Sequence, residues 1–135
     1  MSSKQHGWEN CLVAYLRRCA RSPFRPGELD CGLFTAGAVA VMTGKDYAKG
    51  LRYKTIETGL KQMQKRGFAD HVEYTASLFD ELPSPLYAQR GDIAALRDEN
   101  GNPVLGIVQG EGIYVMTLDG LGLRPLSDSE RAFRV

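Results

Sequence analysis

The spacing of apolar residues predicts that the chain begins with helices. Near the start they recur at the i, i+3, i+4, i+7 interval that aligns side chains on one helical face, which predicts a helix from about residue 7 to residue 20. We therefore expect the two cysteines on this stripe to be buried. The stripe consists of Trp8, Cys11, Leu12, Tyr15, Leu16 and Cys19.

A second helix is predicted from Cys31 to Thr43, a stretch without proline or charge. Asp30 precedes it as a good N-cap, and Gly44 follows as a C-terminal stop. Because this segment is apolar or small on nearly every side, we expect it to lie at the centre of the fold.

Further along, the pattern changes from helices to strands. Thr55 and Asp70 each precede a shorter helical segment, reaching about Arg66 and about Phe79. Beyond the proline-rich break at residues 82–85, strand-length apolar runs alternate with turn signals. The expected strands are 92–96, 104–109, 113–118, 121–125 and an edge strand at 132–135, with a helical turn at 127–131. This order predicts an α+β fold in a single domain over residues 1–135, with a helical half at about 7–80 and a sheet half at about 90–135.

Composition narrows the function classes. The chain has 135 residues, with 17 basic against 16 acidic, which argues against nucleic-acid binding driven by bulk charge. The polar start and the lack of long apolar runs predict neither a signal peptide nor a transmembrane segment. Three cysteines without a C-x-x-C motif favour neither a disulfide framework nor a zinc site, so we expect no metal and no cofactor.

Cys31 is the candidate for chemistry. As the first residue of the predicted central helix, its thiolate would be stabilised by the partial positive charge of the helix N-terminus. A small buried residue that opens a tightly packed helix is the alternative interpretation.

Three blocks resemble the NlpC-like cell-wall cysteine peptidases, a circularly permuted papain-like family. They are Pro23-Phe24-x-x-Gly27-x-x-Asp30-Cys31, Ala88-Gln89-Arg90-Gly91-Asp92-Ile93 and Val104-Leu105-Gly106-Ile107-Val108-Gln109-Gly110. The resemblance implies a papain-like NlpC-type fold, with N-terminal helices packed on a C-terminal antiparallel sheet and Cys31 as nucleophile.

Other segments are similar to a family of short phage and prophage tail proteins with the same layout. They are Met42-Thr43-Gly44-x-Asp46, Arg52-x-x-Thr55, Ala88-Gln89-Arg90-Gly91-Asp92 and Ala132-Phe133-Arg134-Val135. This resemblance implies a virion protein of the distal tail tip, assembled in the host cytoplasm, with other tail-tip proteins as partners.

The sequence departs from the peptidase pattern at the base. The resemblance places the catalytic histidine at position 104 and a further polar group near position 116, where this chain has Val104 and Met116. A thiol peptidase needs a base to move the cysteine proton. His71 is a weak candidate for that role, and a surface histidine beside Asp70 and Glu73 is the alternative.

Three functions follow as hypotheses. The first, which the missing histidine favours, is a structural tail-tip component that has lost catalysis, with Phe133, Tyr53 or Leu86 as interface anchors. The second is an active endopeptidase or amidase on peptidoglycan. The third is a module that binds a peptide or cell wall without cleaving it. A titratable group within hydrogen-bond reach of the Cys31 sulfur discriminates between the first two.

Overall fold

The structure, a computed structural model, describes residues 4–135 and has helices first and strands second. The helices are α1 (Trp8–Ala20), α2 (Cys31–Thr43), α3 (Ile56–Lys65) and α4 (His71–Leu78), and two short 3-10 turns are η1 (Pro85–Tyr87) and η2 (Leu126–Asp128). The strands are β1 (Asp80–Glu81), β2 (Ile93–Arg97), β3 (Pro103–Gln109), β4 (Gly112–Thr117), β5 (Gly120–Pro125) and β6 (Arg131–Arg134). All neighbouring strands are antiparallel, in the order β1-β6-β2-β3-β4-β5. The predicted α+β class is confirmed.

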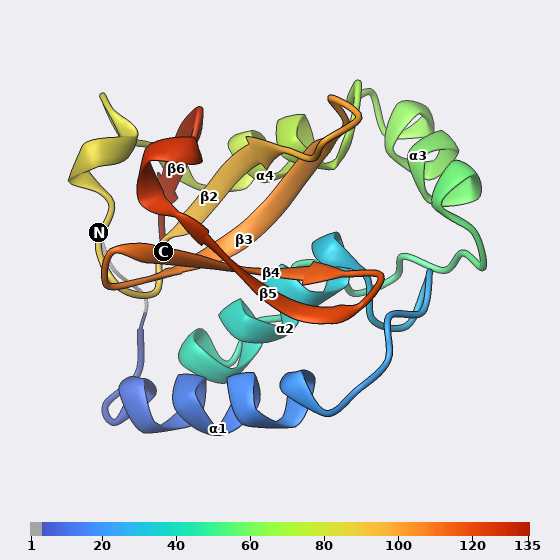
Figure 1. Cartoon of the computed structure of the whole chain (residues 1–135). Helices are drawn as coiled ribbons and strands as arrows, with labels where there is room; N and C mark the ends of the chain where they lie inside the picture. The colour runs from blue at the N-terminus through green and yellow to red at the C-terminus, as the bar shows by residue number, and fades with distance from the viewer. Residues whose placement is uncertain (1–3) are drawn as a thin grey trace.

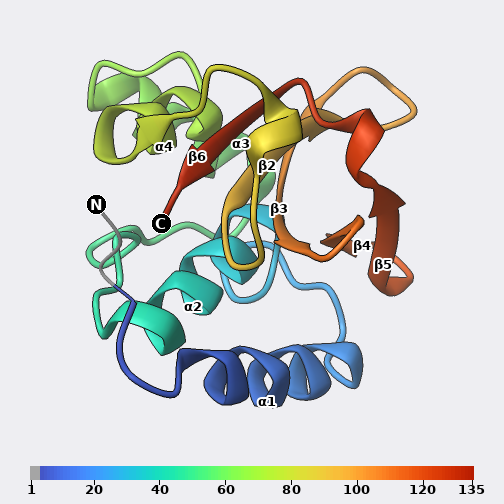
Figure 2. The ribbon, with the colours of Figure 1, turned by 90° about the vertical axis from the view of Figure 1, so that its left-hand side faces the viewer.

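Helix α2 is the central element, as its apolar sequence predicts. It contacts α1 on one side and strands β3 and β4 on the other, and Figure 1 shows it between α1 and the sheet. Figure 2, turned by 90°, shows the same layering, with α3 and α4 away from α1. The start of α2 therefore lies within the fold rather than at its edge.

The contact between α1 and α2 depends on a small residue. A Cβ at Gly37 would lie 2.2 Å from the hydroxyl oxygen of Tyr15, closer than atoms can approach. That hydroxyl donates to the carbonyl of Phe34 at 2.8 Å, and the Tyr15 and Phe34 rings stack with centroids 5.8 Å apart. Gly37 thus lets the Tyr15 ring reach the backbone of α2.

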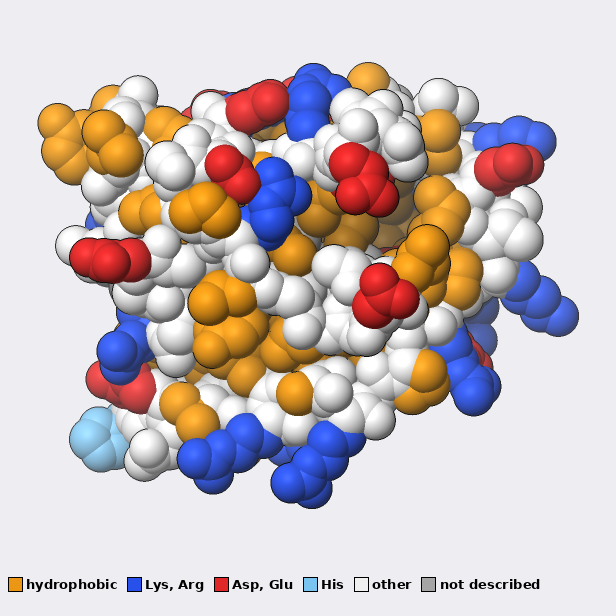
Figure 3. Space-filling model, viewed as in Figure 1, with side chains coloured by type: hydrophobic (Ala, Val, Ile, Leu, Met, Phe, Trp, Pro, Cys, Tyr) orange, Lys and Arg blue, Asp and Glu red, His pale blue; other side chains and the backbone are white. Residues whose placement is uncertain are grey.

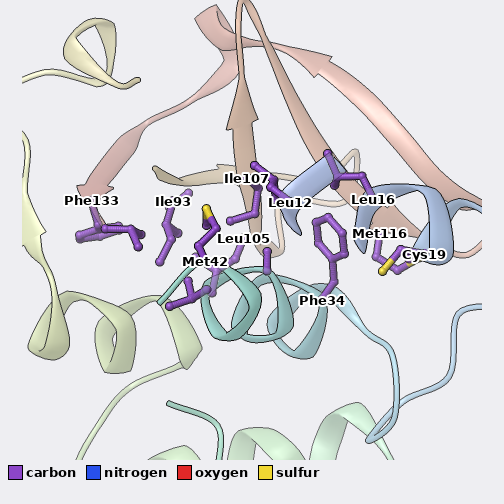
Figure 4. Close-up of a cluster of buried hydrophobic side chains, with 14 of the residues drawn as sticks. Leu12, Leu16, Cys19, Phe34, Met42, Ile93, Leu105, Ile107, Met116 and Phe133 are labelled. Atoms are coloured by element: carbon purple, nitrogen blue, oxygen red, sulfur yellow. The ribbon is translucent and has the colours of Figure 1, made fainter. Parts of the chain in front are cut away.

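The core has two parts, one on each face of the sheet. The larger part fills the space between the helices and the sheet, and Figure 4 shows Phe34 and Met42 of α2 beside Leu105 and Ile107 of β3. The smaller part consists of side chains on the opposite face of the sheet, because successive residues of a strand point to opposite faces. Its buried members are Ala94, Leu96, Val108, Ile113 and Val115.

The prediction that both α1 cysteines are buried is half wrong. Cys19 is buried, but Cys11 is exposed. The buried face of α1 is narrower than the apolar stripe and consists of Leu12, Leu16 and Cys19. Cys11 is one residue before Leu12, so it is rotated by about 100° from the centre of that face.

The last strand is not an edge strand, which corrects a second prediction. β6 lies between β1 and β2 because the two-residue strand β1 pairs with it, Asp80 opposite Arg134 and Glu81 opposite Phe133. A two-residue strand carries no alternation pattern, so the sequence did not indicate it. Phe133 is fully buried as a result and is not an exposed interface anchor, whereas Leu86 is 77% exposed.

A buried carboxylate joins the two ends of the described chain. Asp92, fully buried, accepts hydrogen bonds from the backbone N–H groups of Gln89 (2.9 Å) and Val135 (3.2 Å). It also pairs with the Arg134 guanidinium at 3.2 Å and the Lys4 ammonium at 3.8 Å. Asp92 of the Arg-Gly-Asp block therefore has a structural role in holding β2, β6 and the N-terminal segment together.

The surface carries both charge signs and scattered apolar groups. Figure 3 shows basic side chains along the edge of the molecule formed by α1, whose last turn contains Arg17 and Arg18. Within residues 4–135, none of the helices has the length and apolar character needed to cross a membrane.

Candidate functional site

Cys31 is the first residue of α2, as predicted. The Asp30 carboxylate caps the helix by accepting a hydrogen bond from the backbone N–H of Leu33 at 2.9 Å. Gly44 ends the helix in the left-handed conformation, with φ of 81°. The local signals that define this helix therefore also fix the position of the thiol.

His71 lies beside Cys31. Its Nε2 is 3.6 Å from the Cys31 sulfur, although the two residues are 40 positions apart in the chain. His71 is the first residue of α4, and Asp70 caps that helix by accepting from the N–H of Glu73 at 3.0 Å. Two helices, each preceded by an aspartate cap, thus bring their first residues together.

Helix α4 is held in place from two sides. Arg131 of β6 pairs with Glu73 of α4 at 2.5 Å and with Glu81 of β1 at 2.8 Å. On the other side, the Tyr74 hydroxyl donates to the carbonyl of Tyr47 at 2.9 Å. These contacts tie α4 to the sheet and to the loop after α2, and so position His71.

The Asp30 carboxylate does more than cap α2. Its Oδ2 accepts from the Tyr53 hydroxyl at 2.5 Å and from the backbone N–H of Gly27 at 3.1 Å. The side of Gly27 that would carry a Cβ faces the Tyr53 carbonyl oxygen, 1.9 Å from the ideal Cβ position. Two loops that are distant in the sequence therefore close over Asp30, which is only 2% exposed.

The backbone of β3 completes the surroundings of the sulfur. On the side of β3 that faces β4, the pairing covers only Ile107 to Gln109. Leu105 therefore has no β4 partner on that side. The Leu105 backbone there forms a hydrogen bond that lowers the pKa of the Cys31 thiol. No sequence signal marked this contact, because it involves the backbone of an ordinary apolar residue.

Burial nonetheless decides the protonation state of the pair. It raises the pKa of the Cys31 thiol to about 11, and the backbone hydrogen bonds of Leu105 and Gly32 offset only part of that rise. Burial also lowers the pKa of His71, against the opposing effect of Asp70 and Asp30. At neutral pH the site therefore holds a neutral thiol and a neutral imidazole, not the thiolate that the helix N-terminus alone would favour.

A tyrosine hydroxyl lies in the same buried region. Tyr47 packs its ring edge-on against Phe79, with centroids 5.4 Å apart, and its buried hydroxyl has no hydrogen-bond partner in residues 4–135. Burial raises the pKa of Tyr47, with a smaller contribution from the nearby Cys31, so this hydroxyl keeps its proton.

The positions where the resemblance places the base and its partner hold packing residues. Val104 packs against the smaller core cluster, and Met116 is buried in the larger one. The histidine that lies beside the sulfur is instead His71, which belongs to α4. Its Nδ1 has no hydrogen-bond partner among the residues that the structure describes, so the pair has no third residue bonded to the imidazole.

Other ligand-binding features lie away from the pair. No cluster of three or more metal-binding side chains occurs within residues 4–135. A cavity of about 500 Å³ lies between α1 and the loop that leads to α2, next to Arg18 and Arg25. A cavity of about 280 Å³ lies near the end of α2, next to Tyr47 and Arg134. Neither is lined by Cys31 or His71.

Comparison with known proteins gives a family and a fold. Residues 3–135 match a family described as a domain of unknown function, DUF6950. No curated protein matches the chain. Among solved structures, the NlpC/p60 domain of the peptidoglycan hydrolase SagA is similar, with a TM-score of 0.60 and 15% sequence identity over 93% of this chain and 97% of that one. The chain therefore belongs to the DUF6950 family, and its fold is the α+β papain-like fold of an NlpC/p60 domain.

Proposed function

We propose that this protein is a cysteine hydrolase in which Cys31 is the nucleophile and His71 the general base. The contact of 3.6 Å between the Cys31 sulfur and His71 Nε2 carries the proposal. A nucleophile within reach of a base is the arrangement that thiol hydrolysis requires. A titratable group this close to the sulfur is expected of an active enzyme and is not required of a structural protein that has lost catalysis.

The pair supports a two-step reaction. As the sulfur attacks an acyl carbon, the thiol proton moves to His71 Nε2, and His71 then returns it to the departing amine as the C–N bond breaks. Water attacks the resulting thioester, gives its proton to His71, and releases the acid and the Cys31 thiol. Because the helix start also presents backbone N–H groups, the Cys31 and Gly32 amides are placed to stabilise the oxyanion.

For the substrate we propose a peptide bond of peptidoglycan. The fold similarity to a domain of a peptidoglycan hydrolase supports this class, and so do the three sequence blocks that resemble cell-wall peptidases. The tail-protein resemblance supports a location at the distal tip of a phage tail, with other tail-tip proteins as partners and the bacterial cell wall as the target.

Digestion of purified peptidoglycan tests this function. The wild-type protein is expected to release soluble muropeptides, and Cys31→Ala is expected to release none. Cys11→Ala is the matched control, because Cys11 is exposed on α1 and distant from the helix start of Cys31. Release that is equal in wild type and Cys31→Ala, or absent from both folded proteins, would contradict the proposal.

A second candidate function is a structural tail-tip component with a dormant site. The observation that favours it is the burial that holds the Cys31 thiol in its protonated form. In addition, Nδ1 of His71 has no hydrogen-bond partner within residues 4–135. This candidate function predicts that phage particles assemble normally when they carry the Cys31→Ala variant. Particles carrying the variant would then contain the protein and infect as well as wild type, whereas an enzymatic role predicts assembly with impaired penetration of the cell wall.

A further inference from the structure

His71 has an unusual electrostatic position for a base. It lies at the N-terminus of α4 and beside the N-terminus of α2, and both helix ends carry partial positive charge. This positive charge and burial together oppose the imidazolium that must form when His71 takes the thiol proton. In residues 4–135, no side chain accepts a hydrogen bond from Nδ1 to compensate.

Two carboxylates lie close enough to compensate through space. Asp70 directly precedes His71, and Asp30 directly precedes Cys31. An ideal Cβ on Gly32 would lie 3.6 Å from Asp30 Oδ1 and 3.8 Å from His71 Cδ2. The carboxylate of Asp30 and the ring of His71 therefore border the same small space beside Gly32.

The other polar groups around His71 contribute little charge. The Cys31 thiol and the hydroxyls of Tyr47 and Tyr53 are neutral near pH 7, because burial raises the pKa of each. Glu73, in the first turn of α4, is paired with Arg131, so their charges largely cancel. On the β3 side, Leu105, whose backbone contacts the Cys31 thiol, is an uncharged apolar residue.

We propose that Asp30 and Asp70, the caps of the two helices, jointly supply the negative charge that stabilises protonated His71, in place of a third residue bonded to the imidazole. Their importance for catalysis rests on the hydrolase function proposed above. The electrostatic effect itself does not, because it is a property of the free protein. Both are positioning residues that act through His71 and do not touch the reacting atoms.

Titration of the histidine ring protons by NMR tests this inference in Asp30→Asn and Asp70→Asn. Asparagine is as good an N-cap as aspartate, so the substitution removes charge and keeps the cap. Each variant is expected to lower the pKa of His71 by on the order of one unit, and the double variant by more. Asp119→Asn, in an exposed turn, is the matched control and is expected to leave His71 unchanged.

Assignment is simple because the chain has only two histidines, His6 and His71, and His71→Gln identifies the resonance. An unchanged or raised His71 pKa in either variant would overturn the inference. Within residues 4–135 the Asp70 side chain accepts one hydrogen bond, from the backbone N–H of Glu73, so Asp70→Asn decides the question if Asp30→Asn does not fold.

Activity gives a separate readout. If muropeptides are released, the acid limb of the pH profile is expected to move down with the His71 pKa in both variants, which a purely structural defect would not cause. If no variant releases muropeptides but the His71 pKa falls as stated, the hydrolase proposal fails and the electrostatic inference stands.

Discussion

The sulfur of Cys31 and Nε2 of His71 are 3.6 Å apart, and each belongs to the first residue of a different helix. The pair thus has the composition of a thiol hydrolase site but a different construction. The proposed base, His71, lies on α4, whereas the resemblance to cell-wall peptidases places the base at position 104, on β3. His71 thus lies beside the thiol, while Val104 packs in the smaller core cluster.

Alkylation of Cys31 by iodoacetamide is expected to depend on His71. Because burial raises the pKa of the thiol to about 11, only roughly one molecule in ten thousand carries the thiolate at pH 7. In His71→Gln the rate should be slow at pH 7 and rise about tenfold per pH unit toward pH 11. In the wild type, assistance by neutral His71 should make it faster at pH 7.

Peptide mass spectrometry separates the cysteines, so exposed Cys11 is the control within each sample. Equal rates of Cys31 alkylation in wild type and His71→Gln at pH 7 would show that the two groups are not coupled.

The same thiol predicts a loss of stability at alkaline pH. Its pKa is higher in the folded protein, about 11 against an ordinary value of 9.0, so the unfolded chain releases the proton first as the pH rises. The stabilisation is complete below pH 9 and is lost between pH 9 and 11, by about 2–3 kcal/mol. Urea unfolding at pH 8 and pH 11 measures the fall in the free energy of unfolding. In Cys31→Ala this fall should be about 2–3 kcal/mol smaller than in the wild type. A parallel loss in both proteins would mean that the pKa of the Cys31 thiol is not raised in the folded protein.

Asp92→Asn is expected to destabilise the fold by about 3–5 kcal/mol, because it leaves the buried partners of the carboxylate uncompensated. Those partners include Arg134 and Lys4. Urea unfolding at neutral pH gives the free energy, and Asp119→Asn in an exposed turn should remain within about 0.5 kcal/mol of wild type. If Asp92→Asn lowers the free energy of unfolding no more than the control does, Asp92 does not have the structural role described.

Gly27→Ala is expected to damage the site through the loops that cover Asp30. The new Cβ would collide with the backbone carbonyl of Tyr53, so the Tyr53 hydroxyl should lose its bond to Asp30. We expect a cost above about 2 kcal/mol. Gly101→Ala is the matched control, with the same φ of 80° but open space around the position, and should cost about 1–2 kcal/mol. Thermal unfolding of the two variants gives the comparison, and equal costs would mean that the close approach of the loops is not important.

Local signals in the sequence predicted the helices well. Asp30 and Asp70 as caps and Gly44 as a stop depend only on neighbouring backbone groups, so α2 and α4 begin where expected and α2 ends where expected. The strand β1 was not predicted, because two residues carry no pattern and the pairing with β6 is set by the rest of the sheet.

The candidate site was predicted only in part. Cys31 could be placed because its role depends on the helix that it begins. The position of His71 depends on where α4 packs, which the Arg131 and Tyr74 contacts determine across more than 25 residues of sequence separation. The contribution of Leu105 comes from a backbone N–H at an uncovered strand edge, which has no residue signature at all.

The rate of muropeptide release by His71→Gln shows whether Cys31 and His71 act as one catalytic pair. We expect a fall in kcat/KM of roughly 10²–10⁴ relative to wild type, the usual contribution of a general base, with the folded state confirmed by circular dichroism. His6→Gln, in the exposed N-terminal segment, should retain the wild-type rate. A wild-type rate in His71→Gln would mean that His71 is not the general base for Cys31.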